Sequence, residues 1–214
     1  VKLWVNDFDQ NNIMDKIMTR TIAGMDMPVF IKKDMEDQIP SLKKQNLKHD
    51  VFAKKTIQEL FPDQLLKNSL VKQFNFCSSI IAVNEGNGKF AIQKLPAMVQ
   101  LSSVNAASLA DVNGDGYADL VLGGNEFGFL PQFGRLDAGF GSVLLNNGKG
   151  GFDWIPPARS GLELRGQIRD IVNIPGRGKD YLLFLQNDEY PVLFEYKGKR
   201  AGKPGTFPNK AASK

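Results

Sequence analysis

The chain has 214 residues, of which 42% are hydrophobic and 23% are charged, a composition typical of ordered globular proteins. It contains no apolar run of the ~18 residues that a membrane-spanning helix needs, so we expect no transmembrane segment. The net charge of +4 is modest, and the basic residues are spread among acidic ones, which argues against a nucleic-acid-binding function.

The first segment with recognisable chemistry is the acidic loop Asp7–Asp15. Oxygen-bearing side chains stand at its first, third, fifth and ninth positions, and alternate side chains of a tightly turned loop can point at one centre. Calcium takes about six to eight oxygen ligands, so we predict a calcium site here. The expected ligands are the side chains of Asp7, Asp9, Asn11 and Asp15 and the backbone carbonyl of Ile13. Asn12 stands where glycine would best adopt a left-handed backbone, so we expect slight strain.

Residues 23–75 change from a strand-like to a helical pattern, which predicts a helical insertion. Asp50 can cap the segment 51–61, and Pro62 ends it. The apolar stripe along this segment is typical of core packing, with a partner-binding groove as the alternative. The single cysteine, Cys77, follows in an apolar stretch. No internal disulfide can form, and we expect a buried, unreactive thiol.

An internal repeat with a period of 62 residues follows. Two Asn- and Gly-rich segments, 83–90 and 145–152, show this offset, and each predicts a β-hairpin. The same offset aligns Leu109-Ala110-Asp111 with Ile171-Val172-Asn173, Leu120-Val121-Leu122 with Leu182-Leu183-Phe184, and Asn125 with Asn187. Asp7 precedes Asp111 by 104 residues, which is one period plus an insertion of 42. Several features in one register indicate a genuine repeat.

The second acidic loop, Asp111–Asp119, has the same spacing as the first. The expected calcium ligands are the side chains of Asp111, Asn113, Asp115 and Asp119 and the backbone carbonyl of Tyr117. Gly116 can supply the positive φ of the turn. Three carboxylates in each loop repel one another without a cation. The alternative to a metal site is a polar turn closed by Asp and Asn side chains.

An EF-hand does not fit either loop. It requires a bidentate Glu at loop position 12 and flanking helices. That position holds Met18 in the first loop and Leu122 in the second, and both flanks read as strands. The equivalent stretch of the third repeat, 173–181, has lost the ligand residues, so we expect no calcium there. Arg177 of this stretch stands at the position that Asp115 occupies in the second loop. It is either a fixed cation that takes over part of the metal's role or a solvated side chain.

Two further segments leave alternatives open. The glycine-bounded segment 134–141 contains Arg135 and Asp137, which form either a structural ion pair or part of a ligand-facing loop. The Lys-rich end of the chain, 198–214, is typical of a disordered basic tail.

A β-rich repeat of ~60 residues is typical of a propeller blade. The second acidic loop runs into Leu120-Val121-Leu122-Gly123-Gly124-Asn125, and this pattern resembles the FG-GAP or VCBS-type repeat of β-propellers. The broader layout resembles the C-terminal part of bacterial VCBS-repeat proteins associated with ASPIC/UnbV domains. The resemblance implies a propeller of about seven blades, calcium in several blade loops, and an exported, extracellular or outer-membrane-associated protein.

The predicted fold class is therefore mainly β: a partial β-propeller of about three blades with a small helical insertion. The predicted divisions are a partial blade with the first calcium loop at 1–22, the helical insertion at 23–75, a blade with the second calcium loop at 76–136, a degenerate last blade at 137–197 and the tail at 198–214. The remaining blades would lie upstream of Val1, as would any export signal.

The sequence indicates a binding or adhesion module, with two structural Ca²⁺ ions and an unknown protein or glycan as its partner. It does not indicate an enzyme, because the single histidine, His49, lies in the helical insertion and no nucleophile motif is present. The alternatives are an accessory part of a larger carbohydrate-active enzyme and, with less support, nucleic-acid binding.

Overall fold

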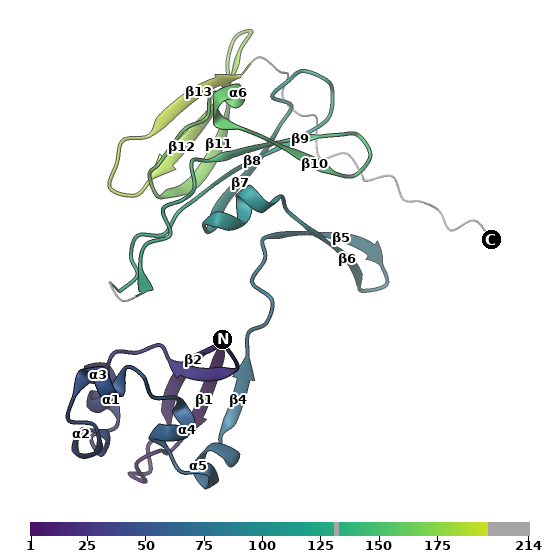
Figure 1. The fold of residues 1–214 in the computed structure, drawn as a ribbon. Coiled ribbons are helices and arrows are strands. Elements are labelled where there is room, and N and C mark those ends of the chain that lie inside the picture. Colours follow the sequence, from purple (N-terminus) through teal and green to yellow (C-terminus); the bar gives the residue numbers. More distant parts are fainter. Residues whose placement is uncertain (131–132, 197–214) are drawn as a thin grey trace. The chain divides into compact units, whose positions relative to one another are not determined.

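The computed structural model describes residues 1–130 and 133–196, which form a mainly β chain with several antiparallel sheets. The chain divides into two compact units, Val1–Cys77 and a second unit that begins at Ser78 (Figure 1). The predicted mainly β class is confirmed. The predicted tail at 198–214 lies outside the described residues.

The first unit is built on a four-stranded sheet in the order β3-β2-β1-β4. Its strands are β1 (Lys2–Asn6), β2 (Asp15–Ile22), β3 (Met25–Pro28) and β4 (Leu70–Gln73). Strands β1 and β2 pair antiparallel, with Asn6 opposite Asp15. Alternate residues of β2 are buried, among them Ile17 and Thr19, as expected for a strand with one face in the core.

Five short helices connect β3 to β4: α1 (Lys32–Gln38), α2 (Leu42–Gln45), α3 (His49–Phe52), α4 (Ile57–Leu60) and α5 (Asp63–Lys67). The helices thus occupy 32–67, and the two ends of the predicted insertion, 23–75, are strands of the sheet. Asp50 lies in the first turn of α3 and is not its N-cap, because α3 begins after Lys48. The apolar stripe packs in the core with Trp4 and Ile17, which confirms the interpretation as core packing.

Cys77 is exposed, so the expectation of a buried thiol was wrong. It lies in the segment 74–79, which belongs to no helix or strand and links the two units. Phe74 and Phe76 in the same segment are also exposed. The apolar sequence here therefore marks a link between units and not a core strand.

The described residues of the second unit form three sheets. A hairpin is formed by β5 (Ile80–Gly86) and β6 (Lys89–Lys94), and the short 3-10 helix η1 (Ala97–Leu101) follows. A four-stranded sheet has the order β10-β9-β8-β7, with β7 (Val104–Ala110), β8 (Asp119–Gly124), β9 (Ser142–Asn146) and β10 (Phe152–Ile155). After helix α6 (Pro157–Ser160), a three-stranded sheet is formed by β11 (Ile168–Pro175), β12 (Asp180–Gln186) and β13 (Val192–Tyr196).

Strands β5 and β9 follow the 62-residue period. The first residues of β5 and β9, Ile80 and Ser142, are one period apart, and both predicted hairpins are present. The four-stranded and three-stranded sheets share a core that includes Val121, Ile168 and Phe184. Among the described residues, no helix is long and apolar enough to cross a membrane.

Candidate metal-binding loops

The first acidic loop brings its carboxylates together where β1 passes into β2. Ligand oxygens of Asp7, Asp9 and Asp15 all lie within 4.8 Å of one another. Within the described ranges, no other set of three acidic, histidine or cysteine side chains comes so close. Carboxylate oxygens are the ligands that calcium prefers, so the donor set fits the predicted metal.

Both loops are closed by the same backbone hydrogen bonds. The Asp7 carboxylate accepts from the N–H groups of Asn11 and Asn12 at 3.0 and 2.8 Å. At the equivalent positions of the second loop, Asp111 accepts from Asp115 and Gly116 at 3.1 and 2.9 Å. These bonds orient the first carboxylate of each loop toward the loop interior.

The last aspartate of each loop is held by a backbone donor at the loop's start. Asp15 accepts from the Phe8 N–H at 2.9 Å, and Asp119 accepts from the Val112 N–H at 2.9 Å. Asp119 also accepts from the N–H of Asn146 in β9 at 2.8 Å. The two loops are therefore equivalent in structure as well as in sequence.

The turn needs a left-handed backbone at two positions of each loop. The second loop meets this need with Gly114 and Gly116, at φ values of 79° and 92°. The first loop uses Gln10 and Asn12, at φ values of 60° and 66°. Because side chains disfavour this region, the first loop carries a backbone cost that the second avoids. The sequence drew attention to Asn12 but gave no sign of Gln10.

The surroundings of the last aspartate of each loop, Asp15 and Asp119, disfavour its ionised form. Burial raises the pKa of Asp15, and the charges of Asp9 and Asp7 raise it further, against a hydrogen bond from Phe8 that lowers it. Burial likewise raises the pKa of Asp119, which exposes none of its surface to solvent. A cation in either loop would stabilise the charged carboxylates and reverse this effect.

The second loop has a side-chain contact that the first loop lacks. The Asn113 amide donates to the Asp115 carboxylate at 2.8 Å, whereas the bond from the Tyr117 N–H to Asp115 has its counterpart in the bond from the Ile13 N–H to Asn11. The three carboxylates of this loop do not meet the 4.8 Å limit that the first loop satisfies. The second loop thus lies closer to the alternative of a hydrogen-bonded polar turn.

The third repeat replaces the acidic loop with a tight hairpin. In the second repeat Leu109 lies opposite Leu120, and the same pairing one period later would place Ile171 opposite Leu182. Asn173 lies opposite Leu182 instead, so the strand pairing of the third repeat is shifted by two residues. Strands β11 and β12 consequently continue to Pro175 and Asp180. This pairing places most of the predicted ligand positions within strands.

Asn125 organises the connection that follows β8, and the sequence gave its repeat position but no role. It is 1% exposed and has a φ of 75°. Its amide donates to the carbonyls of Gly139, Arg165 and Gly166 at 2.8, 3.2 and 3.2 Å. Its Oδ1 accepts from the Gly139 N–H at 2.9 Å. One side chain therefore joins β8 to two distant segments.

The second loop, its two strands and the beginning of β9 lie in a single family match. Residues 103–144 match the family model of the FG-GAP repeat. This FG-GAP repeat includes every predicted ligand of the second loop, as well as Asn125. No curated protein and no solved structure matches the chain.

Proposed function

We propose that the chain is a calcium-binding β-propeller repeat module of an exported bacterial protein and that it binds a protein or a glycan. The observation that carries the calcium assignment is the clustering of Asp7, Asp9 and Asp15 within 4.8 Å. The match to the FG-GAP repeat at 103–144 supports a propeller-type repeat, because the sheet that contains these residues has four strands, as a propeller blade has.

The metal would have a structural role. Calcium in the first loop would be held by Asp7, Asp9, Asn11, Asp15 and the Ile13 carbonyl, and in the second by Asp111, Asn113, Asp115, Asp119 and the Tyr117 carbonyl. Each ion would offset carboxylate repulsion and fix the connection between two strands. Closure of a propeller ring needs about four to eight blades, so we propose that the sheets described here act together with further blades.

Thermal unfolding with and without calcium tests this proposal. A ligand that binds only the folded protein at 100 times its Kd adds about 2.7 kcal/mol to the free energy of unfolding. We therefore expect millimolar calcium to raise Tm and the same concentration of magnesium to raise it less, because magnesium demands a smaller octahedral site. An unchanged Tm in calcium would contradict a structural metal.

Matched variants assign the effect to each loop. Asp7→Asn and Asp111→Asn should each remove one calcium-binding event in a calorimetric titration, because each replaces a carboxylate ligand with a neutral amide. Asp153→Asn is the control, since Asp153 is an exposed residue of β10 outside both loops. Loss of binding in the control as well would show that the ions are bound elsewhere.

A further inference from the structure

A second, separate site lies in the unit that begins at Ser78. A pocket of about 480 Å³ is lined by both charged and aromatic side chains, and this volume is within the range of known ligand sites. Its lining includes Phe127, Arg135, Glu163, Arg165, Gln186 and Glu189. None of them belongs to the acidic loops.

Arg135 is placed by a short antiparallel bridge. Glu126 and Leu136 exchange both backbone hydrogen bonds, at 2.9 and 3.0 Å. Phe127 follows Glu126 and Arg135 precedes Leu136, so these two side chains are neighbours across the bridge. The Arg135 guanidinium lies 4.1 Å from the centre of the Phe127 ring, which fixes its plane by a cation–π contact. This contact takes the place of the predicted ion pair with Asp137.

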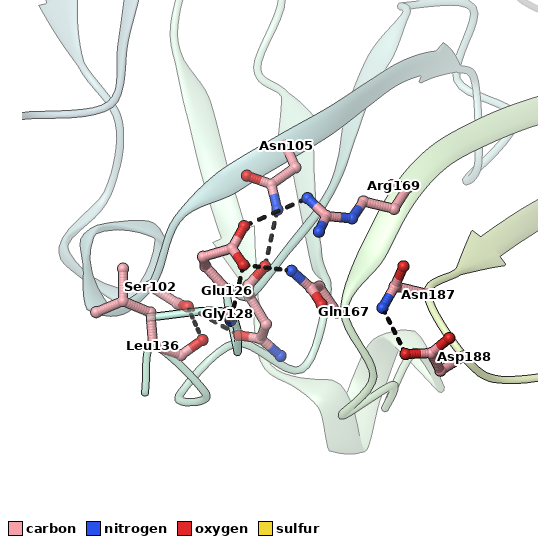
Figure 2. Close-up of polar contacts among 10 residues, drawn as sticks. Ser102, Asn105, Glu126, Gly128, Leu136, Gln167, Arg169, Asn187 and Asp188 are labelled. Carbon is pink, nitrogen blue, oxygen red and sulfur yellow. Dashed lines mark hydrogen bonds and ion pairs between the residues drawn. The ribbon is translucent and has the colours of Figure 1, made fainter. Parts of the chain in front are cut away.

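The bridge is anchored to distant strands. Glu126 accepts hydrogen bonds from Gln167 at 2.7 Å and from Arg169 at 3.3 Å; Figure 2 shows both contacts. Gln167 is 2% exposed, so this contact is sheltered from water. On the other side, the Ser102 hydroxyl donates to the Leu136 carbonyl at 3.0 Å. Arg135 therefore lies on a segment whose geometry is fixed by these hydrogen bonds before a ligand binds.

The two arginines of the pocket differ in their partners. Arg165 lies 4.9 Å from the Phe140 ring and forms an ion pair with Glu163 at 3.2 Å. Arg135 has no acidic partner within ion-pair distance in the described part of the chain. Its planar guanidinium offers paired donors that match the two oxygens of a carboxylate. The arrangement thus favours an anionic group of planar, bidentate shape.

The acidic side chains in the pocket lining disfavour a purely acidic ligand. Glu163 and Glu189 are both exposed carboxylates, and they would repel the adjacent side chains of an acidic peptide. Sugar hydroxyls, in contrast, can donate to them. The Gln186 amide is held by a bond to the Tyr190 carbonyl at 3.1 Å. A Cβ on Gly166 would lie 1.9 Å from Gln186 Oε1, so a larger residue there would displace this amide.

We propose that this pocket binds a carboxylated sugar unit, with the carboxylate on Arg135 and hydroxyl groups on Glu163 and Glu189. The proposal deepens the proposed binding role by naming its ligand class. It does not require calcium, because the pocket and the acidic loops share no residue.

The test uses the full chain and a tetrasaccharide of alternating glucuronate and N-acetylglucosamine, with its carboxyl-reduced form as the neutral probe. Binding is followed by calorimetry and by NMR shifts of the Phe127 and Gln186 side chains. We expect the acidic tetrasaccharide to bind at least about tenfold more tightly than the reduced form, since a hydrogen bond to a charged group is stronger than one to a neutral group. Equal affinity of the two, or no binding of either, would overturn the proposal.

Arg135→Gln should lose this preference, and Arg177→Gln is the matched control because Arg177 is an exposed arginine outside the pocket. Equal affinity of the two variants would contradict the role of Arg135. Tetraglutamate is the competing ligand. If it binds more tightly than the acidic tetrasaccharide, the pocket is a site for an acidic peptide and the sugar proposal is wrong. The titration is repeated in calcium and in a chelator, which separates this proposal from the metal proposal. Sugar binding that persists in chelator would support the sugar site whether or not calcium binds to the acidic loops.

Discussion

At the scale of single residues, the fold depends most on side chains that form hydrogen bonds with backbone groups of other segments. Asn125 does this for three carbonyls and one N–H. Its equivalent one period later, Asn187, is exposed and bonds only to Asp188 and the Gln167 carbonyl in the contacts described. The repeat therefore supplies a natural control for the energetic value of one buried amide.

Replacement of Asn125 by glycine should lower the free energy of unfolding by about 2–3 kcal/mol relative to Asn187→Gly. Glycine keeps the left-handed backbone but leaves buried carbonyls unsatisfied, whereas both variants add similar flexibility to the unfolded chain. Urea unfolding measures the difference. Equal destabilisation by the two substitutions would show that the amide contributes little.

Gln10 is the clearest case of residue-level strain in the described backbone of the first loop. Because its φ is 60°, Gln10→Gly should relieve about 1 kcal/mol of backbone cost. We expect a higher Tm in the absence of metal, measured by differential scanning calorimetry. A lower Tm would mean that the glutamine side chain contributes more than its backbone costs. The control is Gln93→Gly, which places glycine in a strand and should destabilise.

At the scale of elements, the short helices depend on their ends more than on their length. Helix α4 begins with a complete capping box, in which the Thr56 hydroxyl accepts from the Glu59 N–H and the Glu59 carboxylate accepts from the Thr56 N–H. Helix α2 begins at Leu42, and the Ser41 side chain at its N-cap position makes no capping hydrogen bond. A four-residue helix gains little from internal hydrogen bonds, so the cap matters.

Thr56→Ala should therefore cost about 1 kcal/mol, whereas Ser41→Ala should change the stability by less than about 0.5 kcal/mol. Chemical denaturation of both variants gives the comparison. The prediction fails if the Ser41 substitution is as damaging as the Thr56 substitution.

The elements also show which parts of this fold were predictable from sequence. The hairpins, the acidic loops and the repeat were predictable because Asn, Gly and Asp impose local backbone geometry that is visible in a short window. The pairing of β4 with β1 and the shifted pairing of β11 with β12 were not, since both depend on contacts between distant residues. Arg135 was noticed in sequence, but its Phe127 partner was not, because the Glu126–Leu136 bridge that joins them leaves no sequence signal.

At the scale of the whole molecule, the two units can be followed separately because the chain's two tryptophans are divided between them. Trp4 lies in the core of the first unit, and Trp154, in β10, packs against a core cluster of the second that includes Leu95 and Leu144. Trp154→Phe leaves a fluorescence signal from the first unit alone, and Trp4→Phe leaves one from the second.

The first unit should lose stability in acid through Asp26. Burial alone would raise the pKa of this carboxyl, but hydrogen bonds from Lys2, Thr21 and Gln58 and the Lys2 charge outweigh it and hold the pKa below the ordinary 3.8. The Lys2–Asp26 ion pair has an N–O distance of 2.7 Å. A depressed folded-state pKa adds stability that is present above the unfolded value and is lost as the pH falls through the folded value.

Acid titration of Trp154→Phe should accordingly show the free energy of unfolding fall as the pH drops from about 4 downward. Addition of Asp26→Asn should lower the stability at neutral pH and flatten this part of the profile. An unchanged acid slope in the double variant would assign the effect to other carboxyls.

The exposed Cys77 between the units has a practical consequence. It is the chain's sole thiol, so a maleimide dye will attach at one defined point on the link and nowhere else. Energy transfer from Trp4 or from Trp154 to that dye then reports the distance from the link to each unit in turn. The same residue that was mispredicted from its apolar neighbours thus offers a single attachment point from which each unit can be measured.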